Sequence, residues 1–315
     1  MTPAAAAPPA ADAAARGIAF MVLAVLLFSC MDALIKWVSA SHPVGQIVFF
    51  RNLFAFVPVA FFIRRAGGLA VLRTRRVAGH LVRSAFGLAA MVCFFAAFSL
   101  MPLGDAVALG MSGPIFLTAL SVPLLGERVG VRRWSAVAVG FLGVVVMTRP
   151  GAGVFEPVAL FALGGALLYA LAMISMRRLA ATEPTAAIVF YFTAFATVVS
   201  GFSLPLQWVT PATPLDWTLL ASVGLIGGLA QMAMTQAFRL APVALVAPFD
   251  YASLVFAILL GYLIWGDVPD AFLLIGAAVV VGSGLYILHR ETVLTRRRRA
   301  RRRATSAETA RDRAP

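Results

Sequence analysis

The sequence predicts an all-α membrane protein with ten transmembrane helices in two inverted five-helix repeats, and three observations lead to this prediction. Of the 315 residues, 61% are hydrophobic and only 12% are charged, whereas soluble domains average roughly 45 to 50% apolar and about 25% charged residues. The apolar residues form ten runs of about the length of a membrane span. The two halves of the chain also match each other, but with opposite charge bias.

The same composition excludes other classes of protein. The apolar fraction is too high for a disordered chain, and two cysteines are too few for a disulfide scaffold. Only helices and closed barrels satisfy their backbone groups in lipid, and a spanning helix needs roughly 20 mainly apolar residues. The predicted spans are residues 17–38, 44–63, 82–100, 102–125, 134–148, 158–176, 185–206, 217–238, 242–264 and 270–288.

These spans divide the chain into five parts. Residues 1–16 are rich in Ala and Pro and lack the apolar core of a signal peptide, so we expect a disordered tail. Residues 17–148 form the first repeat, 149–157 a linker, 158–288 the second repeat, and 289–315 a polybasic tail. The connections are short, so no segment remains for a soluble catalytic domain.

The distribution of arginine predicts the orientation, because basic residues near span ends are retained on the cytoplasmic side. With the N-terminus inside, the cytoplasmic segments collect five arginines within residues 64–76, three within 128–133, the pair at 177–178 and ten from 290 onward. The opposite orientation would place nearly all of these outside. We therefore expect both termini in the cytoplasm.

An internal repeat joins the two halves at a shift of about 140 residues. At a shift of 141, Pro43 and Phe54 match Pro184 and Phe195; at 140, Gly87, Pro102 and Gly126 match Gly227, Pro242 and Gly266. Five spans in each copy force the second copy to enter the membrane from the opposite side. Two inverted halves can expose one central site to either side in turn, which is typical of secondary transporters.

Three short motifs carry a resemblance to a known family: Phe49-Phe50-Arg51, Leu124-Leu125-Gly126-Glu127-Arg128 and Gly140-Phe141-Leu142-Gly143. Residues 17–288 resemble EamA-type transporters of the drug/metabolite transporter superfamily. The segment from His80 through Arg83 is most similar to the S-adenosylmethionine and riboflavin uptake members. The resemblance implies ten spans, cytoplasmic termini and a central cavity lined by the first four helices of each half.

The second half departs from that pattern. Trp265-Gly266-Asp267 replaces the Leu-Gly-Glu ending of the first half, and Phe192 occupies the place of Arg51. The resemblance is therefore specific for architecture and poor for the substrate.

Ionisable side chains inside a span are costly, so each is a candidate site residue. Asp32 and Arg51 lie at similar depths, about 10 Å from the outer ends of their spans at ~1.5 Å per residue. Two interpretations remain open. In the first, the two residues form a buried ion pair that only fixes helix packing. In the second, they are functional: Arg51 binds an anionic group of the substrate, or Asp32 exchanges a proton during transport.

A second group of candidates lies in the second half. Asp250 and Gln231 have equal depth on neighbouring spans, and Tyr251 adds an aromatic ring with a polar tip. We expect these residues to line a cavity, with Asp250 as the best candidate for proton coupling. Weaker candidates, for which a role in the core is the alternative, are Met111, Ser112, Tyr169 and Tyr191.

No catalytic constellation, cofactor motif or metal-ligand spacing appears in the sequence, and nucleic acid is not an expected partner. The arginine run at 296–303 follows the last span at once, so attraction to anionic lipid explains it. Glycines at 140, 143, 276, 282 and 284 permit close helix contact, either within the monomer or in a homodimer.

The sequence therefore predicts a secondary transporter that moves a small organic metabolite, such as S-adenosylmethionine, riboflavin or an amino acid, by alternating access. A drug or metabolite exporter of the same fold is the first alternative. A membrane enzyme or sensor without transport is the second. The substrate, the direction of transport and the coupling ion are not encoded in any feature of the sequence that we recognise.

Overall fold

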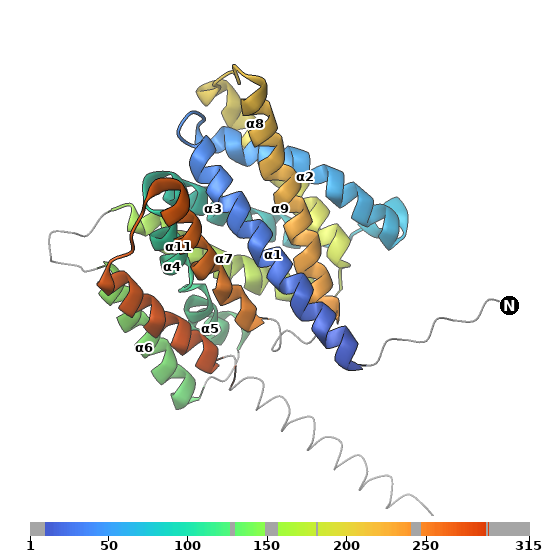
Figure 1. The fold of residues 1–315 in the computed structure, drawn as a ribbon. Coiled ribbons are helices and arrows are strands. Elements are labelled where there is room, and N and C mark those ends of the chain that lie inside the picture. Colours follow the sequence, from blue (N-terminus) through green and yellow to red (C-terminus); the bar gives the residue numbers. More distant parts are fainter. Residues whose placement is uncertain are drawn as a thin grey trace, which may run out of the picture.

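The computed structural model describes residues 10–126, 130–148, 157–180, 182–240 and 247–287, together with His289. In this part of the chain every regular element is helical, and no strand occurs (Figure 1). The helices are α1 Ala10–Val38, α2 Val44–Ala66, η1 Gly68–Leu72, α3 Val77–Leu100, α4 Leu103–Gly110, α5 Gly113–Leu125, α6 Val131–Thr148, α7 Ala159–Ala180, α8 Thr185–Gln207, α9 Pro214–Leu240, η2 Ala247–Tyr251, α11 Ala252–Trp265 and a last helix Ala271–Ile287.

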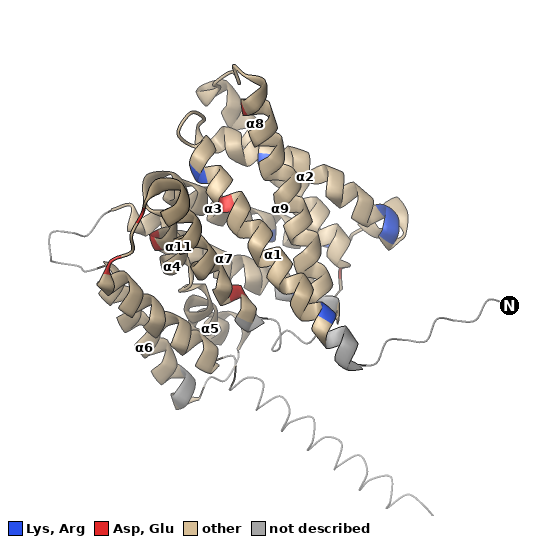
Figure 2. Ribbon diagram, viewed as in Figure 1, with Lys and Arg blue, Asp and Glu red and all other residues tan. Residues whose placement is uncertain are grey.

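The lengths and hydropathy of these helices identify a multi-pass membrane protein. Among the described residues, seven candidate spans are long and apolar enough to cross a bilayer, and three further apolar helices are shorter. Large apolar side chains face outward along the bundle, for example Val57, Phe202 and Leu263 at 62, 79 and 67% exposure. Figure 2 shows few charged residues, most of them near helix ends. The exposed apolar surface fits lipid as the solvent of this fold.

The structure differs from the predicted spans at the start of α3. This helix begins at Val77 and not at residue 82. His80 and Ser84 in its first turns are buried at 2% and 1% exposure. Polar side chains therefore continue the helix beyond the apolar run, because neighbouring helices cover them. An apolar run alone marks the limits of lipid contact, not the limits of the helix.

The predicted fourth span, 102–125, is broken into α4 and α5 around Met111 and Ser112. Pro114 lies in the first turn of α5 and has no N–H to donate to the Gly110 carbonyl, so one hydrogen bond of a continuous helix is missing at this point. The Ser112 hydroxyl donates instead to the Leu109 carbonyl, at 2.7 Å. In the second half, the 3-10 turn η2 precedes α11 in the same way, and residues 241–246 lie outside the described part.

Helices from the first half of the chain pack against helices from the second half, and these contacts fall into matching pairs. α1 packs along α9, and α3 packs along α7. α2 lies against both α8 and α9, while α8 also contacts α3. α1 contacts α11, and α7 contacts α4 and α5. Figure 1 shows α1 and α9 crossing the molecule side by side. The α1–α9 and α3–α7 contacts, the α2–α9 and α8–α3 contacts, and the α1–α11 and α7–α5 contacts thus match when the halves are interchanged.

Local geometry repeats at the same shifts. Pro43 and Pro184 precede α2 and α8 with nearly equal angles, φ −67° and ψ 147° against φ −69° and ψ 145°, and both helices have 23 residues. Gly126 and Gly266 end α5 and α11 in the left-handed conformation, with φ of 66° and 71°. Their N–H groups donate to Val122 and Tyr262, at 3.1 and 3.0 Å. A left-handed residue at a helix end favours glycine, which explains why both positions carry it.

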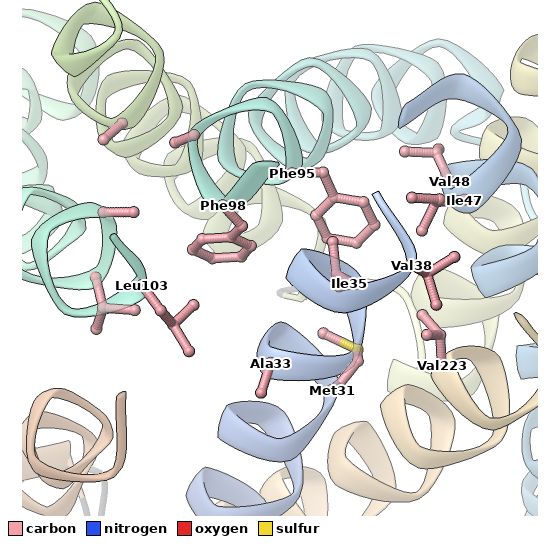
Figure 3. Packing of buried hydrophobic residues seen from close by; sticks show 14 of the residues in the cluster. Met31, Ala33, Ile35, Val38, Ile47, Val48, Phe95, Phe98, Leu103 and Val223 are labelled. Carbon is pink, nitrogen blue, oxygen red and sulfur yellow. The ribbon is translucent and has the colours of Figure 1, made fainter. Parts of the chain in front are cut away.

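The main apolar core lies where α1, α2, α3, α4 and α9 meet. Ile35, Ile47, Leu103 and Leu220 are fully buried there. Figure 3 shows side chains from these helices, including Met31, Phe95 and Val223, converging on one region. This core fixes the relative positions of the helices that carry the charged candidates.

α6 and the last helix form a pair of their own (Figure 1). Gly143 and Gly276 permit their contact: a Cβ on Gly143 would lie 2.8 Å from the Gly276 carbonyl oxygen, and one on Gly276 would lie 2.6 Å from that of Gly143. Gly140 packs on Ile115 and Ser283, while Gly282 meets no atom within 4 Å. Gly140, Gly143 and Gly276 thus serve contact within the chain, one of the two uses expected of the glycines. A homodimer stays a prediction.

Candidate functional site

Arg51 lies in the interior of α2 and is 7% exposed. Its Nη1 donates to Asn52 Oδ1 at 3.1 Å, and the Asn52 amide donates to the Val48 carbonyl at 2.8 Å. Its Nε has no hydrogen-bond partner among the described residues. The guanidinium lies against α9, where a Cβ on Gly227 would be 3.3 Å from Nε. Gly227 thus provides the space that the Arg51 side chain occupies.

Asp32 lies close enough to Arg51 for the two charges to interact. Among the described residues, however, they form no ion pair within 4.0 Å, the limit within which Lys36 and Asp267 do. The expected pairing across adjacent helices is therefore an attraction at longer range. Part of the hydrogen-bonding capacity of Arg51 stays open.

Arg83 lies on α3, at the edge of the predicted span 82–100, and its guanidinium is partly buried. Its guanidinium carbon lies 4.2 Å from the centroid of the Phe192 ring. Its Nε and Nη1 have no hydrogen-bond partner among the described residues. One pattern in the sequence bears on this position. In the internal repeat, Phe192 is equivalent to Arg51, and Gly87 is equivalent to Gly227.

That repeat relation is visible in the packing. A Cβ on Gly87 would lie 3.0 Å from the Phe192 ring and 3.3 Å from Arg83 Nη1. Phe192 of α8 therefore packs on Gly87 of α3 as Arg51 of α2 packs on Gly227 of α9. Gly87 and Gly227 both lie near the middle of their helices, which have 24 and 27 residues. The two arginines thus reach the central part of the bundle.

Tyr169 and Asp250 are two further polar candidates that the sequence predicted. Tyr169 on α7 is 43% exposed, and its ring lies 3.6 Å from where a Cβ on Gly113 would be, at the start of α5. Asp250 in η2 is also exposed. The side chains of both candidates are therefore accessible.

The remaining candidates have structural contacts. Tyr251 packs directly on Gly284 of the last helix, and its hydroxyl has no partner among the described residues. The Tyr191 hydroxyl donates to the Leu72 carbonyl at 2.8 Å, and its ring lies 4.6 Å from that of His80. Met111 packs against two core clusters. Gln231 on α9 is partly buried, and its main-chain carbonyl accepts the Thr235 hydroxyl at 2.8 Å.

Two further clusters lie near helix ends. Lys36 Nζ contacts Asp267 Oδ2 at 3.1 Å and the Met101 carbonyl at 3.0 Å, and it lies 4.9 Å from the Trp265 ring centroid. These contacts join α1, the α3–α4 link and the end of α11. His80 Nε2 lies 3.3 Å from Glu183 Oε2. No group of three metal-ligating side chains occurs within the part of the chain that the structure describes.

A bundle of membrane-length helices with acidic and basic side chains in its interior defines a multi-pass membrane protein with a polar site, the class to which solute transporters belong. Comparison with known proteins makes this specific. The chain belongs to the EamA-like transporter family, whose model matches residues 15–149 and 157–288. The resemblance predicted from the three short motifs is thereby confirmed.

The relatives are named after different metabolites. The pseudopaline exporter CntI of Pseudomonas aeruginosa is 35% identical, over 86% of this chain and 95% of the relative. A riboflavin transporter of Rhizobium johnstonii is 30% identical, over 87% and 91%. An S-adenosylmethionine uptake transporter of Rickettsia bellii is 27% identical, over 87% and 94%. A solved crystal structure at 22% identity shares the fold, with a TM-score of 0.62 over 90% of this chain and 98% of the other.

Proposed function

We propose that this protein is a secondary transporter that moves a small organic metabolite across the bacterial inner membrane by alternating access. Two observations together support this most directly. The helix contacts between the two halves form matching pairs, and charged side chains lie in the interior of the bundle. Family membership and the names of the relatives point to a metabolite transporter and not to an enzyme.

The architecture proposed here is ten spans in two inverted repeats, residues 17–148 and 158–288. Its support is the matched proline starts of α2 and α8, the matched glycine ends of α5 and α11, and the interchange of packing partners. The fourth span of the first half is broken between α4 and α5, and in the second half the 3-10 turn η2 precedes α11. Broken helices that meet at a repeat interface are typical sites of binding in transporters.

The proposed site lies between the halves. Asp32, Arg51, Tyr169 and Asp250 would bind substrate or carry a proton, and Gln231 would line the same space from α9. Met111 and Ser112 stand at the break between α4 and α5 and would shape it. Tyr251 and Tyr191, with their contacts to Gly284 and Leu72, would hold the surrounding helices.

Orientation and lipid contact complete the proposal. We place both termini in the cytoplasm, because the arginine-rich segments lie on that side in this orientation. The arginine run at 296–303 would bind anionic headgroups, at about 1 kcal/mol per residue near the surface.

Export is a second candidate direction, and the 35% identity to a protein named as an exporter favours it. Right-side-out and inside-out vesicles, each incubated with the same labelled metabolite in the external medium, separate the two directions. Uptake predicts accumulation in right-side-out vesicles, and export predicts accumulation in inside-out vesicles.

The decisive experiment is solute flux in proteoliposomes. Candidate metabolites are first selected by thermal stabilisation of the purified protein, screened over amino acids, nucleosides, flavins and S-adenosylmethionine. We expect saturable flux of at least one stabilising compound and none in protein-free liposomes. Absence of flux for every stabilising compound, with a chemical product formed instead, would contradict transport.

A further inference from the structure

Two arginine side chains, Arg51 and Arg83, have buried N–H groups without a hydrogen-bond acceptor. Arg51 is 7% exposed, and its Nε has no partner among the described residues; for Arg83 the same is true of Nε and Nη1. In the described part of the chain, neither arginine forms an ion pair with a carboxylate within 4.0 Å. A buried donor without an acceptor is costly, and more so in a charged group. Both side chains therefore have donors that an anionic ligand would satisfy.

The contacts of Arg51 fix its guanidinium but leave Nε unused. Its Nη1 donates to Asn52 Oδ1 at 3.1 Å. On the side of α9, a Cβ on Gly227 would lie 3.3 Å from Nε and 3.6 Å from Nη2. Glycine at this position thus leaves the space that the guanidinium fills. The cation is held in place with a hydrogen-bond donor to spare.

Arg83 is held by a different contact. Its guanidinium carbon lies 4.2 Å from the centroid of the Phe192 ring, and its Nη1 lies 3.3 Å from where a Cβ on Gly87 would be. The side chain thus extends along α3 toward Gly87, away from the start of the helix at Val77. A guanidinium whose face is covered presents its N–H edge, which binds carboxylate or phosphate in a forked geometry. The side chain is also partly accessible.

One face of α3 brings the two cations near each other. Gly87 and Met91 are four residues apart, so they lie on the same face one turn from each other. The Arg83 guanidinium lies beside Gly87, whereas Asn52 Nδ2 donates to Met91 Sδ at 3.5 Å. Asn52 in turn accepts from Arg51. Arg83 therefore lies beside one turn of this face and the Asn52–Arg51 pair beside the next, about 5.4 Å further along the helix axis.

The internal repeat indicates that this packing does not require the charges. At the equivalent positions of the second half, Phe192 replaces Arg51 and Val223 replaces Arg83. Val223 is fully buried in the apolar core. The two cations thus belong to α2 and α3 of the first half alone. They give the interior one basic wall, which a neutral apolar ligand would not need.

We propose that Arg83 and Arg51 together bind an anionic group, a carboxylate or a phosphate, of the transported metabolite. The substrate class is a small organic anion. Arg83 binds it through its N–H edge and Arg51 through Nε, while Phe192 and Asn52 hold the two guanidinium groups in position. This inference rests on the proposed transport function and adds Arg83 to its site.

The test compares acids with matched neutral molecules. Glutarate is paired with glutaramide, 3-phenylpropionate with 3-phenylpropionamide, and glycerol 3-phosphate with glycerol, so that carboxylate and phosphate are tested separately. Binding to the purified full-length protein is measured by thermal stabilisation and by calorimetry. We expect at least one acid to bind, and its neutral partner to bind at least about tenfold more weakly.

Variants then assign the anionic group to its residues. We expect Arg83→Gln and Arg51→Gln each to weaken binding of the acid roughly 10- to 100-fold, because each loses a charge-assisted hydrogen bond. Binding of the neutral partner should not change. Arg83→Lys keeps the charge without the forked geometry and should lose less. The control is Arg65→Gln, which should keep full affinity: Arg65 is exposed at the end of α2, and its guanidinium also lies near a ring, 5.0 Å from the Phe61 centroid.

The outcomes separate this inference from the proposed function. The inference is overturned if no acid is preferred over its neutral partner, or if Arg83→Gln binds the acid as the wild type does. Equal loss of acid and neutral partner in Arg83→Gln, with a lowered Tm of the unliganded protein, would assign Arg83 a structural role and also overturn it. Flux of a neutral or cationic metabolite in proteoliposomes would then leave the proposed function standing. Binding of an acid without flux of any stabilising compound would instead contradict transport and leave the anion site.

Discussion

Individual ionisable residues in this protein stand on a scaffold that is repeated around them. Asp32 and Arg51 have Met173 and Phe192 at the equivalent positions of the second half. The glycines on which Arg51 and Phe192 pack, at 227 and 87, are the same in both halves. The packing at these glycines is therefore matched in both halves, whereas the charges are not. The charges are thus not required for this packing.

The residue whose charge is most open to test in transport is Asp250. We expect Asp250→Asn to reduce the initial uptake rate in proteoliposomes at least about tenfold, which corresponds to losing about 1.4 kcal/mol of interaction. Asp105→Asn should reduce it far less, because Asp105 lies near the predicted outer end of α4. The two variants change the same group in the same way. Equal, wild-type uptake by both at matched protein levels would exclude Asp250 from the site.

At the scale of helices, contacts at the ends set how the bundle is joined. Lys36 reaches from α1 to Asp267 after α11 and to the Met101 carbonyl before α4. Trp37 and Trp265 lie next to this contact, with ring centroids 6.4 Å apart. One side chain thus ties together three parts of the chain that lie far apart in sequence.

Replacement of this lysine should loosen that end. Lys36→Met loses both hydrogen bonds and the Trp265 ring contact, and we expect a cost of about 1 to 3 kcal/mol, seen as a lower Tm in detergent. Asp267→Asn should cost less, because Lys36 still donates to Met101. A double variant that costs the sum of the two single changes would show that the two charges do not interact.

The pair formed by α6 and the last helix depends on glycine for close approach. Gly143→Ala places a Cβ 2.8 Å from the Gly276 carbonyl oxygen and 3.0 Å from Val280. Because backbone cannot yield as a side chain does, we expect overpacking to cost about 1 to 3 kcal/mol. Gly282→Ala in the same helix pair is the control, since no atom lies within 4 Å of the added group. Equal Tm values for these two variants would contradict the contact.

At the scale of the whole molecule, the charge distribution predicts how the chain lies in the membrane. The net charge of +13 is concentrated in segments at one side of the predicted spans and in the tail beyond residue 289. Large apolar side chains cover the outer surface of the bundle between those segments. In the predicted orientation, the basic residues therefore lie on the cytoplasmic side, and the apolar surface faces the lipid.

This orientation is testable by labelling single cysteines in cells. In a background with Cys30 and Cys93 replaced by alanine, Thr210→Cys in the α8–α9 link should react with a membrane-impermeant maleimide added outside. Ser306→Cys in the tail should react only after the membrane is opened. The reverse pattern would invert the proposed topology without affecting the fold.

Much of the fold is predictable because hydropathy reports directly on the solvent of each segment. Composition identifies lipid, apolar runs locate the spans, and prolines and glycines in register reveal the repeat. The limits of α3 and the break at Met111 were not predicted. The start of α3 depends on the neighbouring helices that bury its polar side chains. The break depends on Pro114, which removes a backbone hydrogen bond of the helix.

The site was predicted in part. The in-span charges at Asp32, Arg51 and Asp250 were found because charge is rare and costly in an apolar run. Arg83 was missed because it lies at the edge of its apolar run, where an arginine is typical of a cytoplasmic segment. Only the packing of Phe192 over its guanidinium brings it into the interior.

The sequence by itself determined the solvent, the helical class, the repeat and the family, since these follow from composition and from patterns along the chain. The tertiary structure decided which charges meet. It placed the Phe192 ring over the Arg83 guanidinium, kept Asp32 beyond ion-pair distance of Arg51, and placed Tyr251 on Gly284. The physical reason is that burial can be inferred from local patterns, whereas the partner of a buried group is set by helices distant in the sequence.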